Sequence, residues 1–294
     1  MSLDGRPVFP DLAARVLRHL GYPTHVDPDL AGLTALYRAW CEQVPFDNTR
    51  KMIALAGGAG RPLPGTSADD FFTNWLAHGT GGTCWPSSNA LYAILRAARF
   101  EARRVVGSMR DLGVLNHASV KVRLAGRDWL ADSSMLTNTP LPLGEGVVVG
   151  DDPVWPVEVE ATGGTHLVWW HTPPGTDYLP CRLLLDPAPF ETYADGFERS
   201  RERSPFNQRL YARRNLPGEL IILIGRTRYS RTRDGVTMRD LSRGELRAAL
   251  CEDIGLSAAL VDEWAACGAL EASFAPAAGS PPPPPVTGKP PSQR

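Results

Sequence analysis

Apolar side chains recur at helical spacing along the first hundred residues. Three stretches repeat an apolar residue every three to four positions, which gives each predicted helix one buried face. These stretches are residues 12–20, 30–41 and 86–98. Ser67 lies three residues before Asp70, which is typical of a capping box at the start of another helix. We therefore predict a mainly helical region over residues 1–107.

The middle of the chain changes to the two-residue alternation of β-strands. From about residue 102 to 232, short alternating runs are separated by Gly, Pro and Asp, which is typical of an antiparallel sheet or a partly closed barrel. After a hairpin closed by Asp234 and Gly235, helical spacing returns over residues 241–250 and 257–266. These patterns predict an α+β protein.

The changes of pattern divide the chain into four parts. Residues 1–107 form the helical region, residues 108–210 a β-barrel, and residues 211–268 an α/β region. Residues 269–294 contain five consecutive prolines and no apolar periodicity, so we predict a disordered or polyproline tail there.

One predicted hairpin is regular enough to give a register. Residues 117–124 alternate polar and apolar side chains, Ala125 and Gly126 form a two-residue turn, and residues 127–132 return. With a loop of this length, residues whose numbers sum to 251 face each other. The predicted pairs are Val120 with Ala131, Val122 with Trp129, Arg123 with Asp128 and Ser119 with Asp132. A loop of odd length would break this parity.

Composition and charge exclude several classes of protein. The chain has 294 residues, of which 43% are hydrophobic, and a net charge of −1, which gives no sign of nucleic-acid binding. Its start lacks the features of a secretory signal, and its longest aliphatic run, residues 220–224, is too short to span a membrane. The five cysteines are scattered and odd in number, and no metal-ligand pattern is present. We expect a cytoplasmic protein with reduced thiols and neither membrane nor nucleic-acid partners.

Cys84 is the strongest candidate for chemistry. It follows a glycine-rich turn, Gly-Thr-Gly-Gly-Thr, and directly precedes the predicted helix that begins near Pro86. The free N–H groups at a helix N-terminus favour a thiolate and can hold a developing oxyanion. The other four cysteines, Cys41, Cys181, Cys251 and Cys267, are interpreted as small hydrophobic residues.

A nucleophilic cysteine requires a base and a group that orients the base. In the sixty residues after Cys84, His117 and Asp132 are the suitable pair. The predicted hairpin register places them on one face as diagonal neighbours. The sequence therefore predicts a Cys84, His117, Asp132 triad for acyl transfer.

The order and flanks of these residues resemble the arylamine N-acetyltransferase family. Members carry Pro-Phe-Glu-Asn, then Arg-Gly-Gly-x-Cys, then a His that opens a strand, then Asp-Val-Gly-Phe. This chain has corresponding segments at residues 44–48, 80–84, 116–119 and 130–135. The similarity extends from about residue 10 to about residue 265, and ordered motifs are more specific than any single one.

The resemblance implies a fold and a reaction. It implies an N-terminal helical bundle, a central antiparallel β-barrel and a C-terminal α/β lid around a cysteine-protease-like catalytic core. It also implies ping-pong acyl transfer from acetyl-CoA or another acyl-CoA to a small-molecule amine, with no permanently bound cofactor. Cys84 would be the nucleophile and its backbone N–H the oxyanion donor, His117 the base, and Asp132 the residue that orients it.

The chain departs from the family pattern near Cys84. The departures are Thr80 for Arg, Asp47 and Pro86 for Glu, Ser88 for Asn, and Ser134 for Gly. We expect packing and hydrogen bonds from Thr80 and Ser87 to replace an ion pair beside the nucleophile.

Three other functions fit parts of the sequence. The triad would also serve an amide synthase that takes a large acyl group from a carrier protein, or a thiol hydrolase or transglutaminase-like enzyme. A catalytically silent protein could present the proline-rich tail to a partner. Trp155, Trp169, Trp170 and Tyr178 are interpreted as core residues, with an aromatic acceptor pocket as the alternative.

Overall fold

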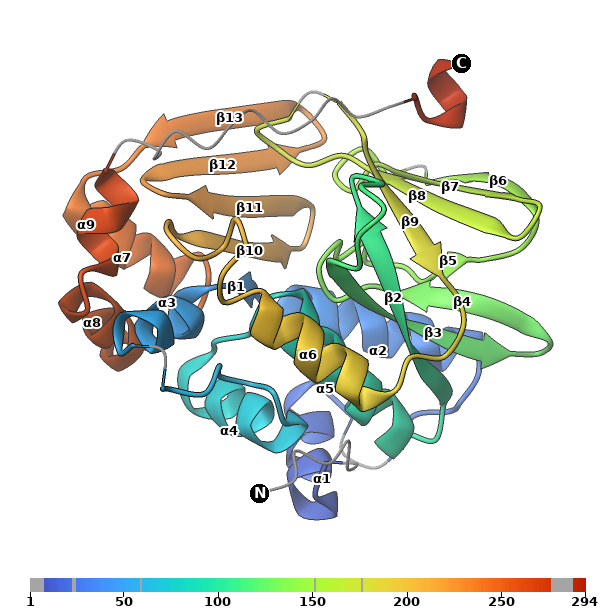
Figure 1. The fold of residues 1–294 in the computed structure, drawn as a ribbon, viewed down its shortest axis with the longest axis horizontal. Coiled ribbons are helices and arrows are strands. Elements are labelled where there is room, and N and C mark those ends of the chain that lie inside the picture. The colour runs from blue at the N-terminus through green and yellow to red at the C-terminus, as the bar shows by residue number, and fades with distance from the viewer. Residues whose placement is uncertain (1–7, 23–24, 59, 151, 176, 276–287) are drawn as a thin grey trace.

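Helices form most of the first hundred residues, as the apolar spacing predicts. The chain is described by a computed structural model over residues 8–22, 25–58, 60–150, 152–175, 177–275 and 288–294. The helices of this region are α1 (Pro10–His19), α2 (Leu30–Gln43), α3 (Thr49–Ala56), α4 (Ala68–His78) and α5 (Cys84–Ala97). Helix α5 is buried along most of its length and lies between the other helices and the β-barrel (Figure 1).

The start of α4 differs in detail from the predicted capping box. The Ser67 hydroxyl accepts the Asp70 N–H at 3.2 Å, as expected. The Asp70 carboxylate, however, accepts the Gly65 N–H at 2.6 Å and contacts Arg50 at 3.2 Å. Only half of the box forms because the preceding loop and α3 provide other donors for this carboxylate.

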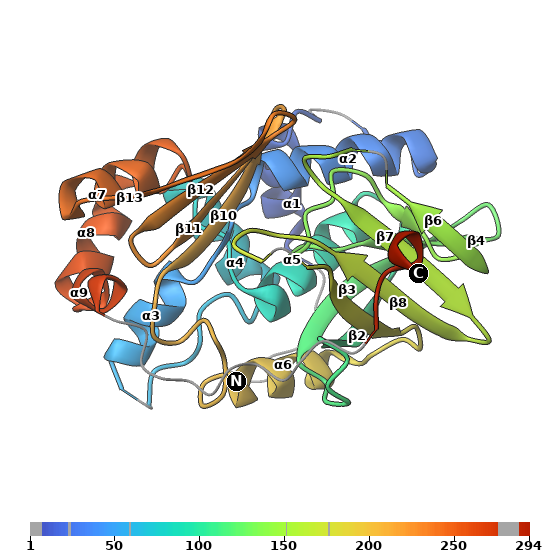
Figure 2. The same ribbon diagram turned by 90° about the horizontal axis from the view of Figure 1, so that it is seen from above.

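The strands form two antiparallel sheets rather than one. An eight-stranded sheet has the order β5-β4-β3-β2-β9-β8-β7-β6 and curls into a nearly closed barrel (Figure 2). Its strands are β2 (Glu101–Met109), β3 (His117–Leu124), β4 (Arg127–Ala131), β5 (Leu141–Pro142), β6 (Gly146–Val149), β7 (Val157–Thr162), β8 (Thr165–Trp170) and β9 (Leu179–Leu184). The α+β class and the barrel are confirmed.

The second sheet has the order β1-β10-β11-β12-β13. Its strands are β1 (Phe46–Asp47), β10 (Tyr211–Leu216), β11 (Glu219–Ile224), β12 (Thr227–Thr232) and β13 (Gly235–Asp240). The helices α7 (Arg243–Glu252), α8 (Ala258–Ala266) and α9 (Ala269–Phe274) pack against one face of it (Figure 1). Helix α6 (Phe190–Arg199) packs against α5.

The predicted hairpin register is confirmed. Strands β3 and β4 pair antiparallel, with Val120 opposite Ala131, Val122 opposite Trp129 and Arg123 opposite Asp128. The two turn residues, Ala125 and Gly126, have positive φ angles of 46° and 78°. Two such residues form the tight turn that matches the twist of paired strands.

The boundaries of the predicted parts do not coincide with the observed elements. Strand β2 begins at Glu101, inside the region 1–107 that we expected to be helical. Strand β1 also comes from that region, yet it pairs with β10 in the C-terminal sheet, with Phe46 opposite Arg213. The Pro-Phe-Asp segment thus ties the Cys84 region to the C-terminal sheet, because Gly82 also forms a bridge to Phe46.

The predicted tail requires a correction. Residues 269–274 form helix α9 rather than a disordered segment, because Ala269 and Leu270 pack against the apolar face of the C-terminal sheet. The proline run lies within residues 276–287, outside the described residues. Residues 288–294 dock on β7, where Ser292 donates from its backbone N–H, at 2.9 Å, and from its hydroxyl to the buried Glu158 carboxylate.

None of the described helices is both long and apolar enough to cross a membrane.

We predict that deletion of residues 288–294 destabilises the barrel. The deletion removes the two hydrogen bonds to Glu158 and the Arg294–Glu160 contacts at 2.7 and 2.9 Å. Hydrogen bonds to a charged group support a loss on the order of 1–3 kcal/mol in the free energy of unfolding, measured by urea denaturation. Arg294→Ala is the control and should cost less than about 1 kcal/mol, because that ion pair is partly exposed. Equal stability of the deletion variant and the full chain would contradict the docking.

Candidate active site

The turn before α5 fixes the position of Cys84. Thr83 is the N-cap residue, so Cys84 is the first residue of the helix, and its side chain is only 8% exposed. Glycine is required at residue 81, because a Cβ there would lie 1.8 Å from the Pro45 carbonyl oxygen. The Ser87 hydroxyl donates to the Gly82 carbonyl at 2.9 Å and closes the turn.

Asp47 holds the same turn through hydrogen bonds. Its carboxylate accepts the Gly81 N–H at 2.7 Å and the Thr80 hydroxyl at 3.2 Å, and it also accepts both donors of Thr49. Burial raises the pKa of Asp47 above its usual value, although these hydrogen bonds act in the opposite direction. The expected replacement of an ion pair by hydrogen bonds from Thr80 and Ser87 is therefore observed.

His117 and Asp132, expected to be diagonal neighbours, are in direct contact. His117 Nε2 donates to Asp132 Oδ2 at 2.7 Å, and both side chains are almost fully buried. His117 also forms a hydrogen bond with Cys84, which favours the protonated imidazole. The Sγ atom of Cys84 lies 3.9 Å from the carbonyl oxygen of Asn116, the residue before His117. The three candidate residues thus come together.

The pair titrates as an ion pair. Burial is the largest single effect on His117 and acts to lower its pKa, but the charges of Asp132 and Cys181 and the hydrogen bonds with Asp132 and Cys84 together raise the pKa well above its usual value. Burial acts to raise the pKa of Asp132, but the His117 charge and hydrogen bonds reverse the effect and lower it. Asp132 Oδ1 also accepts the backbone N–H groups of Ser134 and Met135, each at 2.8 Å.

Sequence reasoning missed Tyr37, which supports this pair. The Tyr37 hydroxyl donates to the Asp132 carbonyl at 2.7 Å and accepts the Asp132 N–H at 3.1 Å. Tyr37 is fully buried on α2. Nothing in the helical pattern distinguishes it from an ordinary core residue, because its partner lies 95 positions away.

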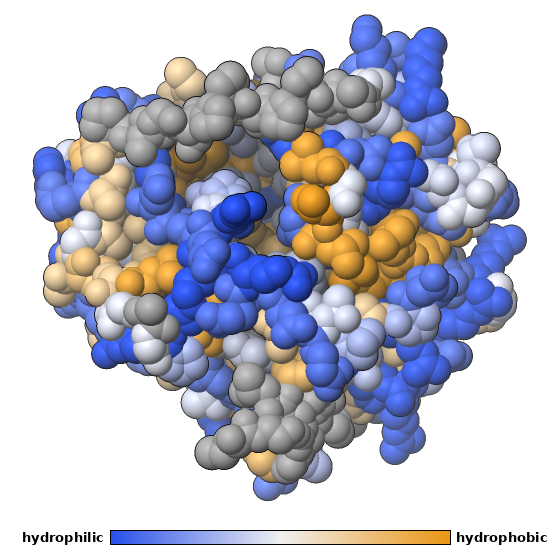
Figure 3. All heavy atoms as spheres, viewed as in Figure 1, coloured by the Kyte–Doolittle hydropathy of each residue, from blue (hydrophilic) through white to orange (hydrophobic). Residues whose placement is uncertain are grey.

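Cys84 and His117 open onto a cavity of about 760 Å³. Its wall includes the aromatic residues Phe46, Trp170, Phe206 and Tyr211. Figure 3 shows this face of the molecule hollowed near its centre, with hydrophobic atoms on one side and hydrophilic atoms on the other. Three apolar residues of the loop between β2 and β3 also line the cavity and are exposed: Leu112, Val114 and Leu115.

Of the tryptophans considered for an aromatic acceptor pocket, two lie in the core and one lines the cavity. Trp155 and Trp169 are buried, and they do not line the cavity that contains Cys84. Trp170, the neighbour of Trp169 on β8, does line it, because successive side chains of a strand point to opposite faces.

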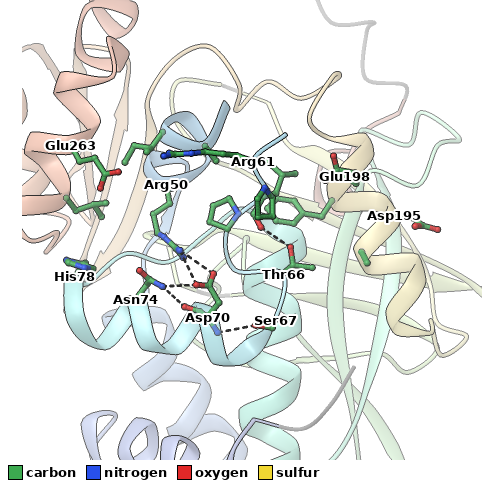
Figure 4. Close-up of a pocket in the computed structure, with 18 of the residues that line it drawn as sticks. Arg50, Arg61, Thr66, Ser67, Asp70, Asn74, His78, Asp195, Glu198 and Glu263 are labelled. Carbon is green, nitrogen blue, oxygen red and sulfur yellow. Dashed lines mark hydrogen bonds and ion pairs between the residues drawn. The ribbon is translucent and has the colours of Figure 1, made fainter. Parts of the chain in front are cut away.

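A second cavity, of about 820 Å³, is shown in Figure 4, and Cys84, His117 and Asp132 do not line it. Arg50, Asp70 and Asn74 lie on one side of it and Glu198 on another. Residues of α6 line both cavities, so this helix separates them.

Comparison with known proteins identifies the family. A family model described as N-acetyltransferase matches residues 29–262, which is most of the chain. The chain belongs to this family. No curated protein sequence matches it.

Solved structures with this fold include several arylamine N-acetyltransferases. The enzyme from Mycobacterium abscessus is 21% identical, with a TM-score of 0.72 over 92% of this chain and 96% of that one. The Mycobacterium marinum enzyme in complex with CoA is 19% identical, with a TM-score of 0.74 over 88% and 97%. The Salmonella typhimurium enzyme is 17% identical, with a TM-score of 0.73 over 87% and 98%. The family resemblance found in the sequence is confirmed, and the chain is an acyltransferase.

We predict that Asp132→Asn lowers acyl-transfer turnover by about three to four orders of magnitude while the fold is kept. An amide stabilises an imidazolium poorly and can favour the wrong tautomer. Asp128→Asn is the matched control on the same hairpin, because Asp128 contacts Lys121 and Arg123 rather than His117. Equal losses in steady-state turnover for the two variants would contradict the assignment of Asp132.

Proposed function

We propose that the protein transfers an acyl group, acetyl in the simplest case, from acyl-CoA to an arylamine, a hydroxylamine or a related amine through an acyl-cysteine. The observation that carries the proposal is the combination of Cys84 at a helix N-terminus with the buried His117–Asp132 pair on the wall of a cavity. A cytoplasmic location, expected from the cysteines, remains a prediction.

The first half-reaction forms the acyl-enzyme. His117 takes the proton of the Cys84 thiol, and the thiolate attacks the carbonyl carbon of the thioester. The tetrahedral oxyanion is held by the Cys84 backbone N–H, which is free at the start of α5. The carbon–sulfur bond to CoA then breaks, and the departing thiolate takes the proton back from His117.

The second half-reaction regenerates the thiol. The amine attacks the acyl-cysteine, and His117 removes a proton from its nitrogen. The bond to Cys84 breaks, the amide leaves, and the cysteine takes the proton from His117. Asp132 orients the imidazole and stabilises its protonated form in both steps.

Three arginines at the cavity support a phosphate-bearing donor. Arg110, Arg199 and Arg203 line it, and none of them forms an ion pair with another described residue. Guanidinium groups bind phosphate through paired hydrogen bonds. The solved Mycobacterium marinum enzyme with CoA supports the same donor class. The aromatic residues on the wall of the cavity support an aromatic acceptor.

An amide synthase fed by a carrier protein is the second candidate. The exposed residues Leu112, Val114 and Leu115, 41–55% accessible, lie at the same opening as the arginines. A hydrophobic patch beside positive charge suits the docking of an acidic carrier.

We predict that mixing the protein with a panel of acyl-CoA thioesters adds the mass of one acyl group to Cys84. Intact-protein and peptide mass spectrometry before addition of amine measure this step. Cys84→Ser should show no adduct and no turnover, because a hydroxyl is far less acidic than a thiol. Adducts with carrier-bound acyl groups alone would favour the amide synthase, and rapid loss of the adduct in water would favour the hydrolase. No adduct with any donor would contradict the proposal.

We also predict that the double variant Arg199→Ala, Arg203→Ala raises KM for acetyl-CoA by about tenfold, because two exposed charge contacts contribute on the order of 1 kcal/mol each at most. The reaction with S-acetyl-N-acetylcysteamine, which lacks phosphates, should keep its KM. A similar change for both donors would show that the arginines do not bind the phosphates.

A further inference from the structure

Arg213 is a buried cation on β10 whose side chain binds the turn that begins at Asp132. It is only 3% exposed. Its guanidinium donates to the Met135 carbonyl at 2.6 Å and to the Ser134 carbonyl at 3.4 Å. No carboxylate among the described residues forms an ion pair with it. The charge of Arg213 is therefore directed at the backbone of this turn.

Asp132 binds the same two peptide groups at their other end. The first peptide group joins Ser134 to Met135. Its carbonyl accepts from Arg213, and its N–H donates to Asp132 Oδ1 at 2.8 Å. The second joins Met135 to Leu136. Its carbonyl also accepts from Arg213, and its N–H donates to the main-chain carbonyl of Asp132 at 3.2 Å. Each peptide dipole points its positive end at Asp132, and hydrogen bonds in series strengthen one another.

The backbone of this turn needs external support. Leu136 and Asn138 have positive φ angles of 49° and 62°, which residues other than glycine adopt only at a cost in free energy. Asn215, also on β10, is fully buried and donates to the Leu136 carbonyl at 2.6 Å and to Asn138 Oδ1 at 2.9 Å. Residues two apart on a strand share a face, so Arg213 and Asn215 hold the turn together.

The turn controls the direction of the Asp132 carboxylate. Its Oδ1 atom is held by the turn, and its Oδ2 atom accepts from His117 at 2.7 Å. A misplacement of about 1 Å in a catalytic group can lower a rate by about 100-fold. Arg213 does not line the cavity that contains Cys84, so its effect on the reaction passes through Asp132.

We propose that Arg213 is a positioning residue for acyl transfer, which holds the turn after β4 in the conformation that lets Asp132 align His117. The inference rests on the proposed function, in which this pair activates Cys84.

The groups around Arg213 leave the pH profile of Cys84 interpretable. The titratable and charged side chains that act on Arg213 are Tyr37, Cys41, Asp132, Tyr211 and Arg231. Burial raises the pKa of both tyrosines and raises the pKa of Cys41 to about 12. These three groups therefore stay neutral between pH 4 and 8, and a change of profile in this range does not come from them.

The first measurement is the rate of Cys84 alkylation by iodoacetamide between pH 4 and 8, with the labelled peptide quantified by mass spectrometry. The thiolate reacts, and it forms together with the imidazolium that Asp132 stabilises. We expect Arg213→Met and Arg213→Gln to raise the midpoint of the profile by about one pH unit, which means about tenfold slower labelling below the wild-type midpoint. Gln keeps a donor for the Met135 carbonyl, which favours normal folding.

Two matched variants separate this role from general effects. Arg214→Met changes the next residue of the same strand, which donates to the carbonyls of Glu42 and Ile254 at 3.1 and 3.3 Å. It should keep the wild-type profile, because neither carbonyl belongs to the turn. Arg213→Lys keeps the charge and a donor, so it should restore most of the labelling rate that the Met variant loses.

The second measurement is a double-mutant cycle. Because the effect passes through Asp132, Arg213→Met should slow labelling no further when Asp132→Asn is already present. In steady-state acetyl transfer, Arg213→Met should lower kcat by about 10- to 100-fold and leave KM for acetyl-CoA within about twofold, because Arg213 does not line the cavity.

An unchanged midpoint in a folded Arg213→Met or Arg213→Gln protein would overturn the inference, as would an equal shift in Arg214→Met or additive losses in the cycle. Faster labelling would overturn it too, because it would show that the guanidinium acts by repelling the imidazolium. If both neutral variants fail to fold while Arg213→Lys keeps the wild-type profile, the role is structural and the inference is wrong.

The proposed function fails separately. Alkylation needs no acyl donor, so the expected shift with no acylation by any thioester would refute acyl transfer and leave the hold of Arg213 on Asp132 standing.

Discussion

The buried contact between His117 and Asp132 constrains more of this molecule than any other interaction. A charged pair this deeply buried is tolerated only when its remaining hydrogen-bonding groups are satisfied. The Asp132 carboxylate obtains them from the backbone of its own turn, and Tyr37 holds the peptide groups on both sides of it. Arg213 of β10 then fixes the carbonyl of Met135 at 2.6 Å. The helical region, the barrel and the C-terminal sheet thus meet around Asp132 and the turn that follows it.

The sequence was sufficient to predict local structure wherever the contacts that determine this structure join residues close together in the chain. A two-residue turn sets the parity of the β3–β4 hairpin, so the position of His117 relative to Asp132 followed from counting residues. The glycines before Cys84 likewise predicted a sharp turn that leads into a helix. The resemblance to the family added the reaction. It also predicted a barrel, whereas the alternating pattern alone did not distinguish a sheet from a barrel.

The features that sequence reasoning missed depend on contacts between distant segments. Strand β1 has two residues, too few for any periodicity, and is defined by its pairing with β10 more than 160 positions away. The docking of Ser292 on Glu158 joins residues 134 positions apart across a proline-rich segment that has no apolar pattern. Lys51 lies in an ordinary helical sequence, so its sequence context does not predict that it is buried.

The substitutions around Cys84 separate two tasks that one ion pair could perform together. The position of Cys84 depends on neutral donors in the turn before it. The Thr80 hydroxyl and the Gly81 N–H donate hydrogen bonds to the Asp47 carboxylate, whose pKa is raised by burial. Such hydrogen bonds fix the turn but bring no positive charge to the sulfur. The positive charge comes instead from His117, which is hydrogen-bonded to Cys84 and becomes an imidazolium when it takes the thiol proton. Because the buried Asp132 carboxylate stabilises that imidazolium, it also favours the thiolate that forms with it, the species that attacks a thioester.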